Sequence, residues 1–408
     1  MTQWQQFKKE YLPAVLSKLD EKWDVFAPVE QEDGFRFKQM PAAGEVFLGP
    51  RKPLLPLKLL FLPEVEELFS YSLKGVSPEL TQAVSGGRER VIFGALGCDI
   101  ASLDILDRVF LTEPVDEAYR RRGEQATLVA LACVGEGPEC FCTSFGIDPL
   151  QPKGADVILV TLANDTPQSE KKETKQKFCG GAGGSFPKEP PARRRQEVFL
   201  LKAFSKKGKR LVEALRPLLT EAPQSDIAQL TDLSSNSRGD VPADSLPREE
   251  SELWDLPLWK NLASRCLGCG VCTLLCPTCY CFDVEDERCG AAGKRFRAWD
   301  SCMSSCFTKM AGGDNPRPTK VERVRQRFLH KLSYYPREKE SVACVGCGRC
   351  TVHCPVGISI EDVILEINRF LASGGEGGVF EKLPPSTPQK TFVDSAGQVS
   401  RTPGGKHE

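Results

Sequence analysis

Two matching blocks of four cysteines constrain this chain more than any other feature of its sequence. The first block reads CLGCGVCTLLCP and the second reads CVGCGRCTVHCP. Both follow the spacing C-x2-C-x2-C-x3-C-P, which holds cubane iron–sulfur clusters in two-cluster ferredoxins, where the fourth Cys of each block ligates the other cluster. We therefore predict two [4Fe–4S] clusters. The predicted ligands are a first thiol set of Cys266, Cys269, Cys272 and Cys354, and a second thiol set of Cys276, Cys344, Cys347 and Cys350.

Zinc knuckles and a disulfide framework are the alternatives for these eight cysteines. Structural zinc sites usually show two separated C-x2-C pairs or mixed Cys/His sets, whereas here each of two matching blocks is closed by proline. The chain has 18 Cys, and it begins with a charged, amphipathic segment that lacks the apolar core of a signal peptide. We therefore expect a cytoplasmic protein whose Cys are metal ligands or free thiols. The sensitivity of cubanes to oxidation favours an anaerobic or microaerobic host.

Length and charge narrow the class of protein further. The chain has 408 residues, of which 40% are hydrophobic, so we expect two or three domains with apolar cores. Its 54 basic and 55 acidic side chains nearly cancel, which argues against a nucleic acid as partner. Its apolar runs are too short to cross a bilayer, so we expect no membrane span.

Alternating strand and helix patterns precede the Cys blocks, and we predict a mixed α/β domain over residues 1–218. The predicted strands are residues 23–29, residues 34–39, VIFGALGCD, ATLVALAC, ADVILVTLA and, at an edge of the sheet, VFLLKAF. The predicted helices are residues 3–19, IASLDILDRVFL and KKGKRLVEALRPLL. A polar segment at residues 165–196 is broken by Gly and Pro, and we expect it to be a loop or an insertion.

Composition divides the rest of the chain into three parts. Residues 219–252 are rich in Ser, Pro, Asp and Glu, as expected for a linker. Residues 253–372 carry both Cys blocks, which helical patterns such as VERVRQRFLHKL separate. We therefore predict an all-helical, ferredoxin-like domain that binds two [4Fe–4S] clusters. Residues 373–408 are expected to be a flexible tail.

Four further cysteines of the first domain define a third thiol set. Cys98 and Cys133 stand at the ends of two predicted strands, and Cys140 and Cys142 follow in the loop ECFC. Neighbouring parallel strands end at the same edge of a sheet, where ligand sites gather. We predict a third [4Fe–4S] cluster at this edge. A zinc ion and a group of simply packed thiols are the alternatives.

The remaining cysteines have no assigned role. Five lie between the blocks, where they are either ligands of another metal or thiols that tune the nearby clusters. These five are Cys279, Cys281, Cys289, Cys302 and Cys306. Cys179 lies in CGGAGG, which does not match the G-x-G-x-x-G pattern of a dinucleotide site, so any flavin or nicotinamide site is expected on another subunit. His330, in RFLHKL, is expected to be a helix residue rather than a ligand.

Several longer motifs resemble a known family. They are GALGCDIASLDILDRVF, DEAYRRR, CFCTSFGIDP, CLGCGVCTLLCPTCYCFDVED, RAWDSCM and CVGCGRCTVHCP, in this order. Together they resemble the iron–sulfur beta subunits of cytoplasmic sulfhydrogenase-type [NiFe] hydrogenases and the A subunit of anaerobic sulfite reductase, over about residues 20–370. The third thiol set matches motif positions of that family. The resemblance implies a subunit that passes electrons between a flavin subunit handling NAD(P)H and a catalytic or further iron–sulfur subunit.

Three functions are compatible with these observations. The leading hypothesis is an electron-transfer subunit that is not catalytic alone, because clusters capped by four Cys carry single electrons and leave no iron open. The second is a reductase whose substrate reacts at an incompletely ligated cluster of its own. The third is a zinc-stapled scaffold. The terminal donor and acceptor, the direction of electron flow, the reduction potentials and the stoichiometry of a complex are not determined by the sequence.

Overall fold

The computed structural model describes residues 3–32, 34–39, 45–49, 51–75, 77–82, 87–133, 139–164, 196–233, 241, 251–373, 392–393 and 399–400. Three expectations lie wholly or largely outside these residues. They concern the loop at 165–196, the tail at 373–408 and the environment of Cys179.

An eight-stranded sheet forms the centre of the N-terminal part, in the order β10-β1-β9-β8-β7-β6-β2-β3. Its neighbours β2, β6, β7 and β8 run parallel, and the outer pairings are antiparallel. The strands are β1 (Gln5–Lys8), β2 (Asp24–Gln31), β3 (Gly34–Gln39), β6 (Arg90–Leu96), β7 (Ala126–Leu131), β8 (Val157–Asn164), β9 (Gln196–Ala203) and β10 (Thr220–Glu221). The mixed α/β character predicted for this region is therefore confirmed.

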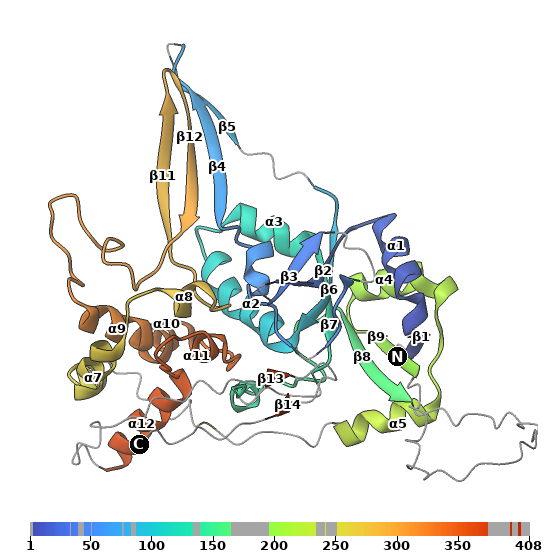
Figure 1. Ribbon diagram of the computed structural model, residues 1–408. Helices are drawn as coiled ribbons and strands as arrows, with labels where there is room; N and C mark the ends of the chain where they lie inside the picture. The colour runs from blue at the N-terminus through green and yellow to red at the C-terminus, as the bar shows by residue number, and fades with distance from the viewer. Residues whose placement is uncertain are drawn as a thin grey trace, which may run out of the picture.

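Helices cover both faces of this sheet (Figure 1). One face packs against α1 (Leu12–Asp20) and α4 (Lys206–Leu215), and the other packs against α2 (Gly97–Phe110) and α3 (Glu117–Gln125). Parallel strands buried on both faces are apolar at almost every position. This explains why their sequences are continuous apolar runs rather than alternating ones.

The structure differs from three sequence predictions at the antiparallel side of the sheet. The first helix begins at Leu12, because Gln5–Lys8 forms β1 and pairs with both β9 and β10. For the same reason β9 is an interior strand and not an edge strand. The segment 219–233, expected to belong to the linker, contributes β10 and the helix α5 (Gln224–Leu233). These pairings join distant segments, and a local pattern does not reveal them.

A second sheet projects from the body of the protein, in the order β11-β12-β4-β5 (Figure 1). Its strands are β4 (Val65–Ser72), β5 (Glu79–Gln82), β11 (Phe282–Cys289) and β12 (Ala292–Trp299). The hairpin β11–β12 lies between the two Cys blocks, so the expected all-helical character of that domain is not confirmed. Gly290 has a φ of 62° in the hairpin turn, which favours glycine. The hairpin is stabilised by pairing with β4, a partner more than 200 residues away along the chain.

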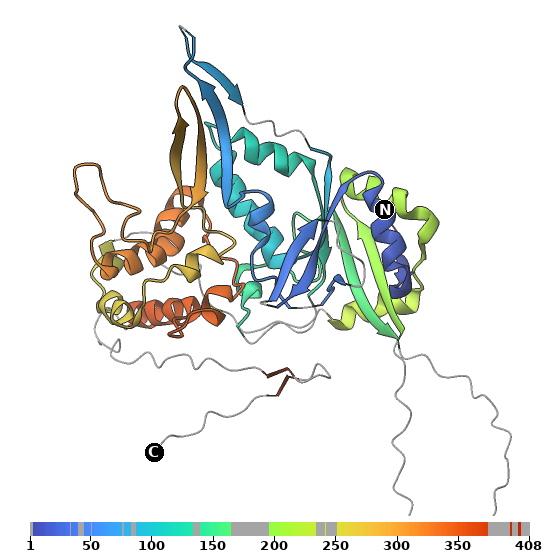
Figure 2. The ribbon, with the colours of Figure 1, turned by 45° about the horizontal axis from the view of Figure 1, so that its top comes forward.

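The rest of the dicluster region is helical (Figure 2). Its helices are α6 (Ser251–Trp254), α7 (Pro257–Arg265), α8 (Val271–Leu274), α9 (Lys320–Leu329), the π turn η6 (His330–Tyr334), α10 (Tyr335–Lys339), α11 (Arg349–Val352) and α12 (Ile360–Ala372). Their core includes Trp259 of α7 stacked on Phe328 of α9, with ring centroids 6.0 Å apart. A capping box of Thr319 and Glu322 begins α9, because these side chains satisfy the free amides of its first turn.

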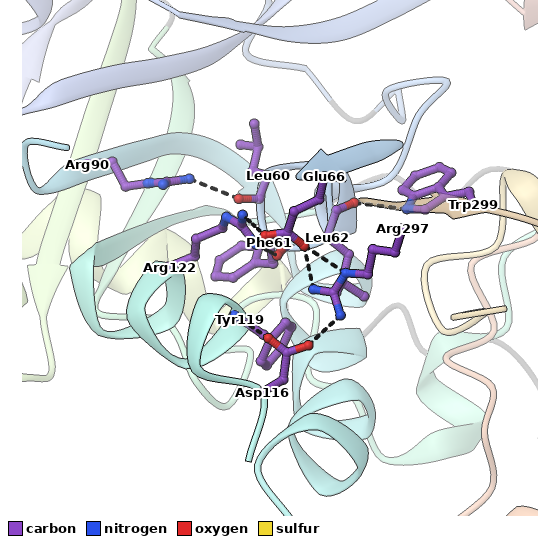
Figure 3. A network of polar contacts seen from close by, with 10 residues as sticks. All are labelled: Leu60, Phe61, Leu62, Glu66, Arg90, Asp116, Tyr119, Arg122, Arg297 and Trp299. Atoms are coloured by element: carbon purple, nitrogen blue, oxygen red, sulfur yellow. Dashed lines mark hydrogen bonds and ion pairs between the residues drawn. The ribbon is translucent and has the colours of Figure 1, made fainter. Parts of the chain in front are cut away.

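A buried network of charges anchors the projecting hairpin to the N-terminal domain (Figure 3). Arg297 of β12 donates through Nε to Glu66 of β4 at 2.7 Å and also pairs with Asp116 before α3. Arg122 of α3 pairs with Glu66 from the other side. The side chains of Arg297 and Glu66 are 7% and 5% exposed, so both charges depend on partners inside this network for compensation.

We predict that Arg297→Ala loosens this hairpin. Removal of the guanidinium leaves Asp116 without its cationic partner and Glu66 with Arg122 alone, at a cost of about 3 kcal/mol. Amide hydrogen exchange within residues 282–299 is therefore expected to become roughly 100-fold faster. Arg295→Ala is the matched control, because its pair with Asp286 is 44% exposed on both sides and solvent screens it. Equal exchange in the two variants would contradict a structural role for the buried network.

Candidate metal centres

The four thiols of the first set line one cavity. Cys266 follows α7, Cys269 lies in the loop before α8, and Cys272 lies on α8. Cys354 comes from the second block, two residues after α11, and lines the same cavity. The structure therefore groups three thiols of one block with the last thiol of the other block.

The second set is grouped in the reciprocal way. Cys276, the last thiol of the first block, lies close enough to Cys344, Cys347 and Cys350 for their charges to interact. Burial raises the pKa of Cys344 and of Cys350 to about 12, and the neighbouring Cys276 contributes to both increases. Unligated thiols would therefore stay protonated at neutral pH, and coordination to a metal is what ionises them.

Backbone amides donate hydrogen bonds to sulfur in both blocks. The amide of Gly268 lies 3.3 Å from Sγ of Cys266, and the amide of Gly346 lies 3.5 Å from Sγ of Cys344. Such donors stabilise negative charge on the sulfurs of an iron–sulfur cluster. The two blocks therefore share local geometry as well as sequence.

Two buried cations show that these sites suit an anionic group. Arg327 lines the first cavity, is 4% exposed, and its Nε has no hydrogen-bond partner within the described part of the chain. Lys331 is 3% exposed and lies 3.3 Å from Sγ of Cys276. Burial lowers the pKa of each cation, but the surrounding thiolates outweigh it and hold both values above their usual range. Because a cubane with four thiolates is negatively charged, the residues present fit a [4Fe–4S] cluster in each set.

A site for a single metal ion is a different arrangement. Across the residues that the structure describes, no three His, Cys, Asp or Glu side chains converge enough to hold one ion. A cubane does not require such convergence, because each thiolate binds its own iron. When bound, a cubane supplies a one-electron couple, and the chain's residues set its charge environment and its access to solvent.

Three thiols of the third set, Cys98, Cys140 and Cys142, lie in one region, and Cys133 lies at the same edge of the sheet. Cys98 lies in the first turn of α2, just beyond the end of β6, and Cys140 and Cys142 are buried nearby. Lys52 donates to Sγ of Cys140 at 2.5 Å, and its charge also interacts with Cys98. Cys133 lies two residues beyond β7, where its backbone amide donates to Pro149. The parallel pairing of β6 and β7 therefore puts Cys98 and Cys133 at the same edge of the sheet.

The loop that carries Cys140 and Cys142 packs directly on the second Cys block. The amide of Phe141 donates to the carbonyl of Gly346 at 2.9 Å. A Cβ on Gly346 would lie 2.6 Å from the backbone of Phe141, and one on Gly348 would lie 2.5 Å from Glu139. Both glycines also have a positive φ. The close approach of the two loops therefore requires glycine at both positions.

A buried ion pair also connects the N-terminal domain to the second Cys block. Arg349 of α11 makes two hydrogen bonds with the carboxylate of Asp99, each 2.7 Å long. Asp99 follows Cys98, and Arg349 lies between Cys347 and Cys350. The pair therefore holds a ligand candidate of the third set next to the second set, and the charges of Cys98 and Cys347 interact.

Of the thiols between the blocks, Cys279 lies beside a proposed ligand, and Cys281 and Cys302 lie against each other. The Cys279 thiol donates to Cys276, and this hydrogen bond is the main cause of the lowered pKa of Cys276. Cys281 lies against Cys302, and their hydrogen bond lowers the pKa of Cys281 to about 7. Cys289 and Cys306 are exposed. His330 contacts the hydroxyl of Tyr280 at 3.2 Å, in agreement with a role as a helix residue.

Sequence reasoning missed the charged residues around the thiols. A signal for two of them exists on α9 and η6, where Arg327 and Lys331 interrupt the apolar stripe that contains Val324 and Phe328. A basic residue within an apolar helix face indicates a buried cation, and hence a buried anion nearby. No comparable local signal marks Lys52 or Asp99, because their partners are distant in sequence.

A cavity of about 1010 Å³ extends along α2 and α3 to the second Cys block. Its lining includes Ile105, Phe145, Cys344 and Val345. One thiol of the second set, Cys344, therefore lines this cavity. The first set reaches the surface, because Cys269 is exposed and the neighbouring Leu267 is 64% exposed.

Comparison with known proteins agrees with this architecture. The family model of the 4Fe-4S dicluster domain matches residues 265–358, which contain both Cys blocks and the hairpin between them. The chain is thus an iron–sulfur protein that binds [4Fe–4S] clusters. It is 30% identical over 368 residues to sulfhydrogenase 2 subunit beta of Pyrococcus furiosus, an alignment that covers 89% of this chain and 97% of the relative. The chain therefore belongs to the iron–sulfur beta subunits of sulfhydrogenase type, as its motifs predicted.

No solved structure matches the chain. Within the described part of the molecule, no helix is both long enough and apolar enough to cross a membrane.

Iron analysis tests the exchange of ligands between the blocks. Cys266→Ala and Cys354→Ala remove ligands of the same set, so each single variant and the double variant are expected to lose the same iron, about four atoms per chain. Cys266→Ala combined with Cys276→Ala removes ligands from one block but from both sets, and about eight iron atoms are expected to be lost. A greater loss in the first double variant than in its single variants would contradict the grouping.

A second prediction concerns the stability provided by the Asp99–Arg349 pair. Arg349→Met leaves a fully buried carboxylate without a partner, so the free energy of unfolding is expected to fall by about 3–5 kcal/mol. Asp99→Leu combined with Arg349→Met removes both charges and is expected to recover most of that loss. Anaerobic urea unfolding measures both values, and a double variant no more stable than Arg349→Met would contradict the explanation.

Proposed function

We propose that this chain is the electron-relay subunit of a multisubunit oxidoreductase. Electrons pass between a subunit that binds flavin and NAD(P)H and a catalytic or further iron–sulfur subunit, and this chain is not catalytic alone. The relay consists of two [4Fe–4S] clusters held by the first and second thiol sets, and a third cluster held by Cys98, Cys133, Cys140 and Cys142. The observation that carries the proposal is the cavity in which three thiols of one Cys block meet the last thiol of the other.

The order of the sets along the molecule supports a linear relay. The second set is linked to the first because each set takes its fourth thiol from the block of the other. The second set is linked to the third because Cys98 and Cys347 interact across the Asp99–Arg349 pair. The second set therefore holds the middle cluster of the relay. Because Cys269 is exposed, the first set is accessible to a partner subunit.

The chain's own residues account for containment and orientation of the metal centres. Arg327 and Lys331 supply positive charge inside the protein, and the amides of Gly268 and Gly346 donate to ligand sulfurs. The sulfhydrogenase beta relative supports a place within such a complex. The predicted domain division, with β10 and α5 assigned to the N-terminal domain instead of the linker at 219–252, and a cytoplasmic location belong to the same proposal.

Replacement of one ligand in each cubane tests the relay. In the complete complex, Cys269→Ser and Cys347→Ser are each expected to lower electron transfer from NAD(P)H to the terminal acceptor by more than about tenfold. Reduction of an artificial dye by the flavin subunit is expected to continue at its normal rate. Cys289→Ser is the matched control, because this exposed thiol lies at the end of β11, outside all three sets. Undiminished transfer in both ligand variants would refute the relay.

A further inference from the structure

Three buried cations form a row along α9 and the π turn η6. Arg323, Arg327 and Lys331 are spaced by four residues, so they lie on one side of the helix. All three are less than 9% exposed. Arg323 donates to the backbone carbonyls of Arg317 and Pro318, while the other two cations face thiols. The π turn, a rare geometry that is frequent at functional sites, positions the last of them.

Lys331 has no carboxylate partner within the described part of the chain. Its Nζ donates to Sγ of Cys276 at 3.3 Å, to Oγ1 of Thr278 at 2.8 Å and to the carbonyl of Ala343 at 3.0 Å. A buried ammonium is costly unless an anion compensates it. The thiolates around Cys276 and Cys344 are the anions that lie closest to it. Lys331 is therefore a fixed positive charge of the second set.

The other cations act on the two sets less directly than Lys331. The charge of Arg327 interacts with Cys272 of the first set and with Cys350 of the second. The charge of Arg349, beside Cys347, is compensated by Asp99. Lys320 contacts only the carbonyl of Cys266 near the first set, and it is exposed, so solvent screens it. Lys58 is 3% exposed and its charge also interacts with Cys276, but its Nζ donates to the carbonyl of Cys279. Lys331 is the buried cation that donates directly to a ligand sulfur of the second set.

We propose that Lys331 is a positioning residue that raises the reduction potential of the second cluster above that of the first. The electron is then held on the second cluster, in the middle of the relay. The inference rests on the proposed function, because it requires a cluster in each set. Reduction adds negative charge to the cluster and its thiolates. A hydrogen bond and a buried positive charge next to Cys276 stabilise that added charge. Both contacts act more strongly on the reduced state than on the oxidised state.

Lys331→Met tests this in the complete, anaerobically purified complex. A potentiometric titration followed by the paramagnetic signal of the reduced clusters measures each one-electron step. At the wild-type midpoint of the second cluster, the ratio of reduced to oxidised cluster is expected to fall at least tenfold, which is a shift of 59 mV to lower potential for one electron. The step of the first cluster is expected to stay in place. Cys347→Ser identifies the step that belongs to the second cluster.

Three further variants separate charge, hydrogen bond and folding. Lys331→Arg keeps both the charge and a donor. In this variant the ratio of reduced to oxidised second cluster at the wild-type midpoint is therefore expected to change by less than threefold. Lys331→Gln keeps a donor without the charge, and a shift in the same direction as in Lys331→Met is expected. If Lys331→Met loses iron, the midpoint of Lys331→Gln is the measurement that tests the inference. Lys320→Met, the same substitution at the exposed start of α9, is expected to leave the second cluster's midpoint in place.

The possible outcomes are distinguishable. An unchanged midpoint in an iron-replete Lys331→Met or Lys331→Gln variant would overturn the inference and leave the relay intact. An equal shift of both steps would also overturn it, because Lys331 would then not distinguish the clusters. A wild-type complex whose beta subunit contains no iron would instead overturn the proposed function.

Discussion

The buried pair of Asp99 and Arg349 is the contact on which the arrangement of the thiol sets depends. Both side chains are almost inaccessible to solvent, and each would be a costly isolated charge without the other. Asp99 belongs to the first turn after a parallel strand, whereas Arg349 belongs to the tight loop of the second Cys block. Their two parallel hydrogen bonds allow little freedom of orientation. The α/β domain and the dicluster region are thus joined at the place where thiols of both approach each other.

The two Cys blocks are near copies in sequence, but their surroundings differ. Leu267 in the first block is 64% exposed, whereas Val345, its counterpart in the second block, is 3% exposed. The second block is covered by the loop that carries Cys140 and Cys142, while the first faces solvent. One block is therefore suited to contact with a partner and the other to an internal position. The cations follow the same division, since Lys331 lies with the inner set.

Much of the fold could be predicted from local patterns. Apolar runs marked β6, β7 and β8 because these strands are buried on both faces, and the spacing of Cys and Gly marked both blocks. The hairpin β11–β12 was not anticipated, although its sequence alternates, because its stability depends on β4 and on the contact between Arg297 and Glu66. Lys52 and Asp99 were missed for a related reason. Their importance comes from neighbours that are distant in sequence.

The sequence by itself determined the candidate ligands and the class of metal centre that they suit. Four thiols at short, glycine-bearing spacing can bind only a few kinds of metal centre, and that restriction is local. Only the tertiary structure decided which set is internal, which set reaches the surface and which cations lie beside each. The reason is physical. Burial and electrostatic interaction depend on distances between side chains, and folding brings together residues such as Asp99 and Arg349 that are 250 positions apart.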